Sequence, residues 1–225
     1  MEKLHILLDN GHGNNTPGKC SPDKSLLEYK YCREITAMIK DELDEKYECF
    51  ETVILVPEDW DVTLKERVNR CNKICKDKGS QNCIFLSIHN NAAGNSSNWM
   101  SARGWSGWIY RNASEKSKLL ANLLFDACAE LKLKTRKPLP NQKYWDCGFY
   151  ICKNTNCPAV LTENFFQDNK EDVDFLLSDE GKQAVADIHI NAILKYYKEI
   201  FGEEPKMKPN TIAEQTMPCG GCNFI

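Results

Sequence analysis

Three side chains that can bind a metal ion or move a proton stand near the ends of apolar segments. His12, His89 and Glu163 each end, or shortly follow, a run of aliphatic residues. Two imidazoles and one carboxylate are the ligand set of a catalytic zinc, with one position left for water. Such a zinc lowers the pKa of its bound water to about 7 and polarises a carbonyl oxygen. The pattern therefore predicts a hydrolytic zinc centre.

The identity of the carboxylate ligand stays open on spacing alone. Glu28 opens the first predicted helix, and the segment from 13 to 27 can fold back to place it beside His12; Glu34 and Asp23 are alternatives. If Glu28 is the ligand, Glu163 is free to take a proton from the water and give it to a leaving amine. Asp9 either hydrogen-bonds to a metal ligand and orients it, or caps the loop turn.

The elements that position these side chains alternate between strands and helices. Apolar or β-branched runs predict strands, and periodic apolar residues predict helices. This alternation indicates an α/β domain with a largely parallel, helix-covered sheet, in which ligands bind at the carboxyl ends of the strands. The predicted strands cover 4–8, 52–56, 83–88, 104–110, 149–152 and 159–161, and the predicted helices cover 25–43, 62–76, 114–133 and 181–200.

Two further features of the organisation follow from the pattern. No helix separates the runs 83–88 and 104–110, so we expect the second to be antiparallel to its neighbours. Residues 134–147 read as a loop. The catalytic domain is expected to cover 1–202, and the composition of 203–225 indicates an irregular tail.

Composition excludes several classes of protein. With 225 residues and a net charge of −3, the chain lacks the basic stripe of a nucleic-acid binder and any apolar run long enough to span a membrane. No signal peptide is apparent, so we expect a cytoplasmic protein, or a secreted one if a leader was removed. Most of the twelve cysteines occupy apolar positions typical of reduced, buried thiols. The exceptions are the spaced group Cys147, Cys152 and Cys157 and the tail pair Cys219 and Cys222, which we leave unassigned.

Several motifs occur in a fixed order along the chain. They are Asp-Asn-Gly-His-Gly at 9–13, Glu28, Arg-x-x-x-x-Asn at 67–72, Ser-Ile-His-Asn-Asn-Ala at 87–92, Pro-Ala-Val-Leu-Thr-Glu at 158–163, a leucine pair at 176–177 and Tyr196. In these features the sequence, from about His5 to Tyr197, resembles the zinc-dependent N-acetylmuramoyl-L-alanine amidases of the third amidase class. That family includes bacterial autolysins and phage endolysins.

The resemblance implies a fold, a metal site and a reaction. The fold is a three-layer α/β/α arrangement with a mostly parallel, mixed and twisted sheet. His12, Glu28 and His89 would bind one Zn²⁺ per chain, and Glu163 would be the catalytic glutamate. The reaction would be hydrolysis of the peptidoglycan amide between the lactyl group of N-acetylmuramic acid and L-alanine. The sequence departs from the family at Asn14, Asn90 and Asn164. These departures remove none of the expected ligands, but they line the expected cleft and concern the fine specificity for substrate.

Substrate contacts and alternative functions complete the expectations. We expect Asn90, Asn91, Asn164, Trp99 and Trp145 to contact substrate, with the tryptophans stacking on sugar faces. The rival functions are a zinc peptidase acting within the stem peptide, a non-catalytic wall-binding module, and a redox protein using Cys219 and Cys222. No obligatory protein partner is evident. The absence of a leader suits a phage endolysin released at lysis; a host autolysin is the alternative.

Overall fold

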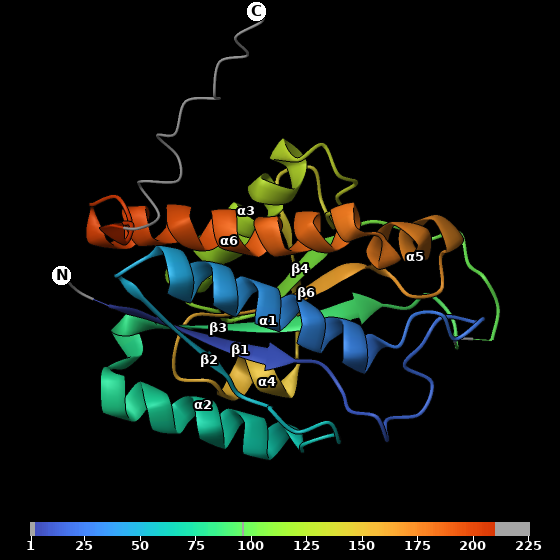
Figure 1. Cartoon of the computed structure of the whole chain (residues 1–225), viewed down its shortest axis with the longest axis horizontal. Coiled ribbons are helices and arrows are strands. Elements are labelled where there is room, and N and C mark those ends of the chain that lie inside the picture. The colour runs from blue at the N-terminus through green and yellow to red at the C-terminus, as the bar shows by residue number, and fades with distance from the viewer. Residues whose placement is uncertain (1–2, 96, 210–225) are drawn as a thin grey trace, which may run out of the picture.

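Six strands form one mixed sheet at the centre of the molecule (Figure 1). The computed structural model describes residues 3–95 and 97–209. The strands lie in the order β2-β1-β3-β6-β4-β5, and the first four are parallel to one another. As predicted, β4 is antiparallel to its neighbour β6; β5 runs parallel to β4. Their bounds are β1 Leu4–Asn10, β2 Phe50–Ile54, β3 Cys83–Asn91, β4 Ser106–Tyr110, β5 Tyr144–Cys147 and β6 Ala159–Phe166.

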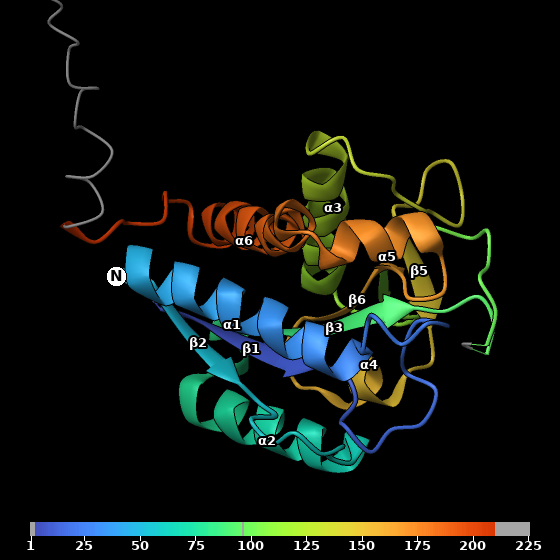
Figure 2. The same cartoon turned by 45° about the vertical axis from the view of Figure 1, so that its right-hand side comes forward.

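Helices cover both faces of the sheet, which confirms the three-layer arrangement (Figures 1 and 2). One face packs against α1, α3, α5 and α6, and the other against α2 and α4. Every residue of β1 is buried, and its side chains alternate between the two cores, as the unbroken apolar run requires. The helices are α1 Glu28–Lys46, α2 Leu64–Lys78, α3 Glu115–Glu130, α4 Tyr150–Asn154, α5 Lys170–Leu177 and α6 Asp179–Phe201, with a 3-10 turn η1 at Ser80–Asn82.

The helix starts show why these segments begin where they do. Hydroxyl side chains cap three of the long helices: Thr63 accepts from the backbone of α2, Ser114 from α3 and Ser178 from α6. Helix α1 begins differently, because Leu27 precedes it and provides no side-chain cap. Its first residue, Glu28, therefore stands at an uncapped helix start that faces the carboxyl ends of the strands.

The segment around residue 150 differs from the prediction. The strand expected at 149–152 is wrong: these residues enter the short helix α4, where Ile151 and Cys152 are buried while Phe149 and Tyr150 are exposed. Four apolar residues cannot distinguish a strand from a single helical turn by periodicity. The loop expected at 134–147 ends in β5, which forms because it pairs with β4.

The end of the described chain returns to the link between α1 and β2. Met207 forms an antiparallel bridge with Tyr47, and the backbone N–H of Lys208 donates to the carbonyl of Lys46 at 2.8 Å. Residues 210–225, with Cys219 and Cys222, lie outside the described residues. The ten cysteines within the described ranges are all free thiols. Within the same ranges, no helix has the length and apolar character needed to cross a membrane.

Candidate metal centre

The structure brings His12, Glu28 and His89 together at the carboxyl ends of β1 and β3. His12 lies in the turn after β1, His89 lies near the end of β3, and Glu28 opens α1. Nε2 of His12 and Nδ1 of His89 lie 3.3 and 3.2 Å from the same oxygen, Oε1 of Glu28. Tetrahedral zinc with bonds of about 2.0–2.1 Å holds its ligand atoms about 3.3–3.4 Å apart. Both distances to Glu28 match this spacing, and all three ligand atoms lie within 4.8 Å of one another, so the three side chains could hold one metal ion.

The charges of these three side chains are strongly coupled. Burial disfavours the charged form of Glu28, but hydrogen bonds and charge from His12 and His89 outweigh it and lower the pKa of the carboxyl group. Burial lowers the pKa of His12, whereas for His89 the neighbouring acidic groups outweigh burial and raise the pKa. The second carboxylate oxygen of Glu28 is buried without a hydrogen-bond partner. A buried carboxylate between two imidazoles is a site that a divalent cation would neutralise.

The backbone at His12 is held in an unusual conformation. Its φ is +58°, in the left-handed region that residues with a side chain rarely adopt. Two guanidinium groups donate to its carbonyl oxygen, from Arg33 at 3.2 Å and from Arg67 at 3.3 Å. The preceding Gly11 is also required, because a Cβ there would lie 2.6 Å from the His89 ring. These contacts direct the His12 imidazole toward Glu28.

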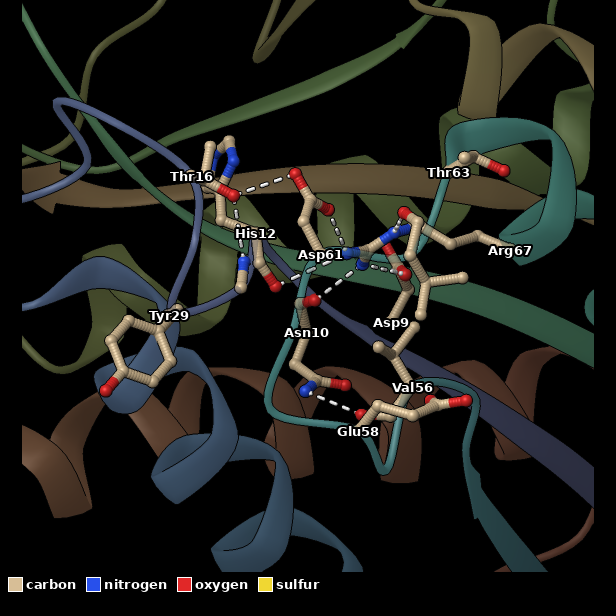
Figure 3. Close-up of polar contacts among 12 residues, drawn as sticks. Asp9, Asn10, His12, Thr16, Tyr29, Val56, Glu58, Asp61, Thr63 and Arg67 are labelled. Carbon is tan, nitrogen blue, oxygen red and sulfur yellow. Dashed lines mark hydrogen bonds and ion pairs between the residues drawn. The ribbon is translucent and has the colours of Figure 1, made fainter.

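Arg67 of α2 is the hub of a buried polar network beside the centre (Figure 3). The carboxylate of Asp9 accepts from Arg67 at 2.8 Å and from the Ser87 hydroxyl at 2.6 Å. Asp9 is thus linked through Arg67 to the carbonyl of His12. The sequence marked Arg67 only as part of a motif, since its partners in the segment 9–12 lie at least 55 residues away. Its acceptors are the carboxylates of Asp9 and Asp61 and the carbonyls of Asn10, His12 and Val62.

Glu163 lies beside the three candidate ligands. It is the register partner of His89 on the adjacent parallel strand β6, so the two side chains project to the same face, with the strands about 4.8 Å apart. The residue is partly exposed, yet its Oε2 atom is buried and has no hydrogen-bond partner. Burial raises the pKa of Glu163 to about 7, and the charge of Glu28 adds to this effect while His89 opposes it. A carboxyl group with this pKa can both accept and return a proton near neutral pH.

A cleft of about 460 Å³ opens beside the two histidines. Its walls come from the turn after β1, the start of α2 and the end of β3. The lining residues are Asp9, His12, Thr16, Asp61, Val62, Thr63, Leu64, Arg67 and His89.

The expected substrate-contacting asparagines take a different place. Asn90 and Asn164 are buried, because their side chains are used inside the fold. The Asn90 side chain donates to the Asn164 carbonyl at 2.6 Å, and the Asn164 side chain donates to the His89 carbonyl at 3.1 Å. The backbone N–H of Asn90 also donates to Oε1 of Glu28 at 3.0 Å. Asn91 is half-buried, and its side-chain oxygen accepts from the backbone N–H of the next residue, Ala92, at 2.8 Å.

The two tryptophans lie at different positions relative to the centre. Trp99 is 39% exposed, and the Lys170 ammonium group lies 5.4 Å from its ring centroid. Trp145 lies in β5, where it stacks on Trp108 with ring centroids 5.2 Å apart. Three strand spacings separate β5 from β3, about 14 Å. The structure therefore does not bring Trp145 against the histidines.

Comparison with known proteins agrees with this geometry. Residues 6–195 match the family described as N-acetylmuramoyl-L-alanine amidase. The chain belongs to this amidase family. It is 27% identical over 219 residues to the endolysin of Bacillus phage SPP1, covering 96% of this chain and 75% of that protein. It is 25% identical to the N-acetylmuramoyl-L-alanine amidase CwlM of Bacillus licheniformis, covering 86% of this chain and 69% of the relative.

Solved amidase structures share the fold. The N-acetylmuramoyl-L-alanine amidase from Clostridium difficile 630 superposes with a TM-score of 0.75 at 22% identity, covering 88% of this amidase-family chain and 98% of the other. The catalytic domain of CwlV from Bacillus (Paenibacillus) polymyxa var. colistinus gives a TM-score of 0.71 at 23% identity, covering 87% and 98%. At these identities the likeness establishes the three-layer fold.

Proposed function

We propose that this chain is a zinc-dependent N-acetylmuramoyl-L-alanine amidase that cleaves the peptidoglycan amide between the lactyl group of N-acetylmuramic acid and L-alanine. The observation that carries the proposal is the convergence of His12 and His89 on one oxygen of Glu28, with Glu163 as the register partner of His89. Family membership supports the choice of bond. The relation to a phage endolysin supports a protein that acts on the cell wall after release from the cytoplasm.

His12, Glu28 and His89 would hold one zinc ion, and a donor set of two imidazoles and one carboxylate supports zinc. When bound there, zinc would lower the pKa of a coordinated water and polarise the amide carbonyl. The protein's own part is to fix the ligands. Arg67 and Arg33 hold the His12 backbone, while Asn164 holds the carbonyl of His89.

Glu163 would carry the proton through the reaction. Its buried Oε2 atom would take the proton from the attacking water, and the same oxygen would return it to the nitrogen of the departing L-alanine. The raised pKa supports this role, because a carboxylate of ordinary acidity holds a proton poorly near neutral pH. Asn90 and Asn164 would position the ligands from inside the fold. Trp99, exposed on its loop, is the better placed of the two tryptophans for contact with a glycan chain.

Digestion of purified sacculi tests the proposal directly. We expect the protein to release stem peptides whose L-alanine carries a free amino group, together with glycan strands that bear unsubstituted lactyl groups. Mass spectrometry of the products identifies the bond. Fragments cleaved between two amino acids would instead identify a peptidase, and binding to sacculi without any release would identify a non-catalytic module.

A further inference from the structure

A second set of potential metal ligands lies in the core between the sheet and helices α2 and α4. Cys71 and Cys75 occupy one side of α2, and Cys157 lies just before β6. All three thiols are buried, and their sulfur atoms lie within 4.8 Å of one another. Buried cysteines normally pack as isolated small apolar groups, so three thiols in mutual contact from two distant segments need another explanation.

The spacing of the sulfur atoms matches tetrahedral metal coordination. The Sγ atom of Cys71 lies 4.0 Å from that of Cys75 and 3.9 Å from that of Cys157. Zinc binds thiolates at about 2.3 Å, which places tetrahedral sulfur ligands about 3.8 Å apart. A disulfide needs sulfur atoms about 2.05 Å apart and joins only two of the three. The two separations are compatible with ligands of one central ion and are too long for a bonded pair.

A fourth thiol stands next to this cluster. Cys83, the first residue of β3, is a buried free thiol. It packs in the same core as the other three cysteines. A structural zinc site is closed by four protein ligands. The Cys83 sulfur is not among the three that lie within 4.8 Å of one another, so Cys83 would supply the fourth ligand by a rotation of its side chain.

The surrounding polypeptide fixes the cluster from two sides. The side chain of Asn72, next to Cys71 on α2, donates to the carbonyl of Asn154 at 2.9 Å and accepts from the backbone N–H of Asn156 at 2.8 Å. This amide clamp holds the segment before Cys157 against the helix. Cys147 and Cys152 do not belong to the cluster, and the thiol of Cys152 donates to the carbonyl of Trp108 at 3.9 Å.

We propose that Cys71, Cys75 and Cys157 form a structural zinc site that is separate from the catalytic centre, with Cys83 as the fourth ligand after a rotation of its side chain. Each thiol that binds would release one proton to solvent, giving a thiolate ligand. Six residues of extended strand separate Cys83 from His89, about 20 Å along β3. The site would join α2 to the amino ends of β3 and β6, the two strands that carry His89 and Glu163.

The test uses a full-length background variant in which other zinc ligands are removed. His12→Ala and His89→Ala abolish the catalytic centre, and Cys219→Ser with Cys222→Ser excludes the tail thiols. After purification under reducing conditions from zinc-supplemented cells, we expect one zinc per chain by elemental analysis. Replacement by Co²⁺ should give the intense near-ultraviolet absorption of thiolate-to-cobalt charge transfer, which imidazole and carboxylate ligands do not produce.

Matched serine variants assign the signal to the cluster. Cys71→Ser and Cys157→Ser in this background should lose the zinc and the cobalt absorption. Cys128→Ser is the control, because this buried thiol on α3 packs in the opposite core. A background variant that carries no zinc, or that binds cobalt without thiolate absorption, overturns the proposal. So does a Cys71–Cys157 disulfide found by alkylation and mass spectrometry. These readouts need no activity, and the zinc content of the background variant decides the proposal whether or not the serine variants fold.

Discussion

Replacement of Glu163 by glutamine should remove activity while stabilising the metal-free protein at alkaline pH. The folded protein holds the Glu163 proton up to a pH of about 7, whereas the ordinary value is 4.5. At about 1.36 kcal/mol for each pH unit, this difference corresponds to at most about 3 kcal/mol, and to less where the cleft admits water. Glutamine keeps the shape and carries no charge. Because Oε2 makes no hydrogen bond, none of its partners is lost.

The sign of the pH dependence follows from where the proton resides. Between pH 4.5 and 7 the unfolded chain has released the Glu163 proton and the folded protein retains it, so the parent loses stability as the pH rises. Glu163→Gln has no ionisable group at this position, so its stability does not fall for this reason. The stability of the variant minus that of the parent should therefore grow from near zero at pH 4.5 to about 2–3 kcal/mol at pH 8.

Urea unfolding in the presence of a chelator measures this difference. Digestion of sacculi measures activity, and we expect turnover to fall by about 10²–10⁴-fold, the usual contribution of a general acid–base group. Zinc content should stay unchanged. Glu199→Gln, at an exposed position on α6, is the matched control and should change neither property. A stability difference that does not vary with pH, or near-parent digestion by Glu163→Gln, would refute the reasoning.

Three further perturbations probe other parts of the structure. Glu28→Gln should weaken zinc binding at the catalytic centre, as measured by chelator competition against the parent. Loss of a residue that only hydrogen-bonds to a metal ligand typically costs roughly 10–100-fold in affinity, and loss of the ligand Glu28 should cost more. Arg67→Met leaves the buried Asp9 carboxylate without its ion pair and should cost about 3–5 kcal/mol in urea unfolding; Asp9→Asn in the same chain should restore part of that loss. Burial lowers the pKa of His189 to about 4, so the unfolded chain takes up this proton near pH 6.5 while the folded protein does not. Stability should fall by up to about 3 kcal/mol as the pH drops from 6.5 to 4, and His189→Gln should remove this part of the slope.

The sequence predicted the elements whose patterns are long and regular. The apolar runs of β1 and β3 and the periodic stripes of α2, α3 and α6 were sufficient, because burial on one or both faces determines those patterns. The antiparallel β4 followed from the missing crossover helix. β5 and α4 were not predictable in the same way. Each has four or five residues, and its conformation depends on the elements beside it.

The residues of the candidate site also divide into those that a local sequence pattern marks and those that it does not. His12, His89 and Glu163 could be predicted because each follows an apolar run, and parallel strands bring such positions to one edge. The choice of Glu28 needed the family resemblance. The network of Arg67 was missed because its ion pair with Asp9 spans 58 residues, and no local pattern marks such a contact. The convergence of Cys157 on Cys71, 86 residues apart, was missed for the same reason.

The pairing beyond α6 has a practical consequence for fusions. The backbone of Leu4 bonds to Cys49, and that of Lys208 bonds to Lys46, so both ends of the described polypeptide meet the link between α1 and β2. This link lies at the amino ends of the parallel strands, remote from the histidine pair. Reporter proteins or wall-anchoring modules joined directly before residue 3 or directly after residue 209 would start together on that side and leave the mouth of the cleft accessible to a bulky polymer.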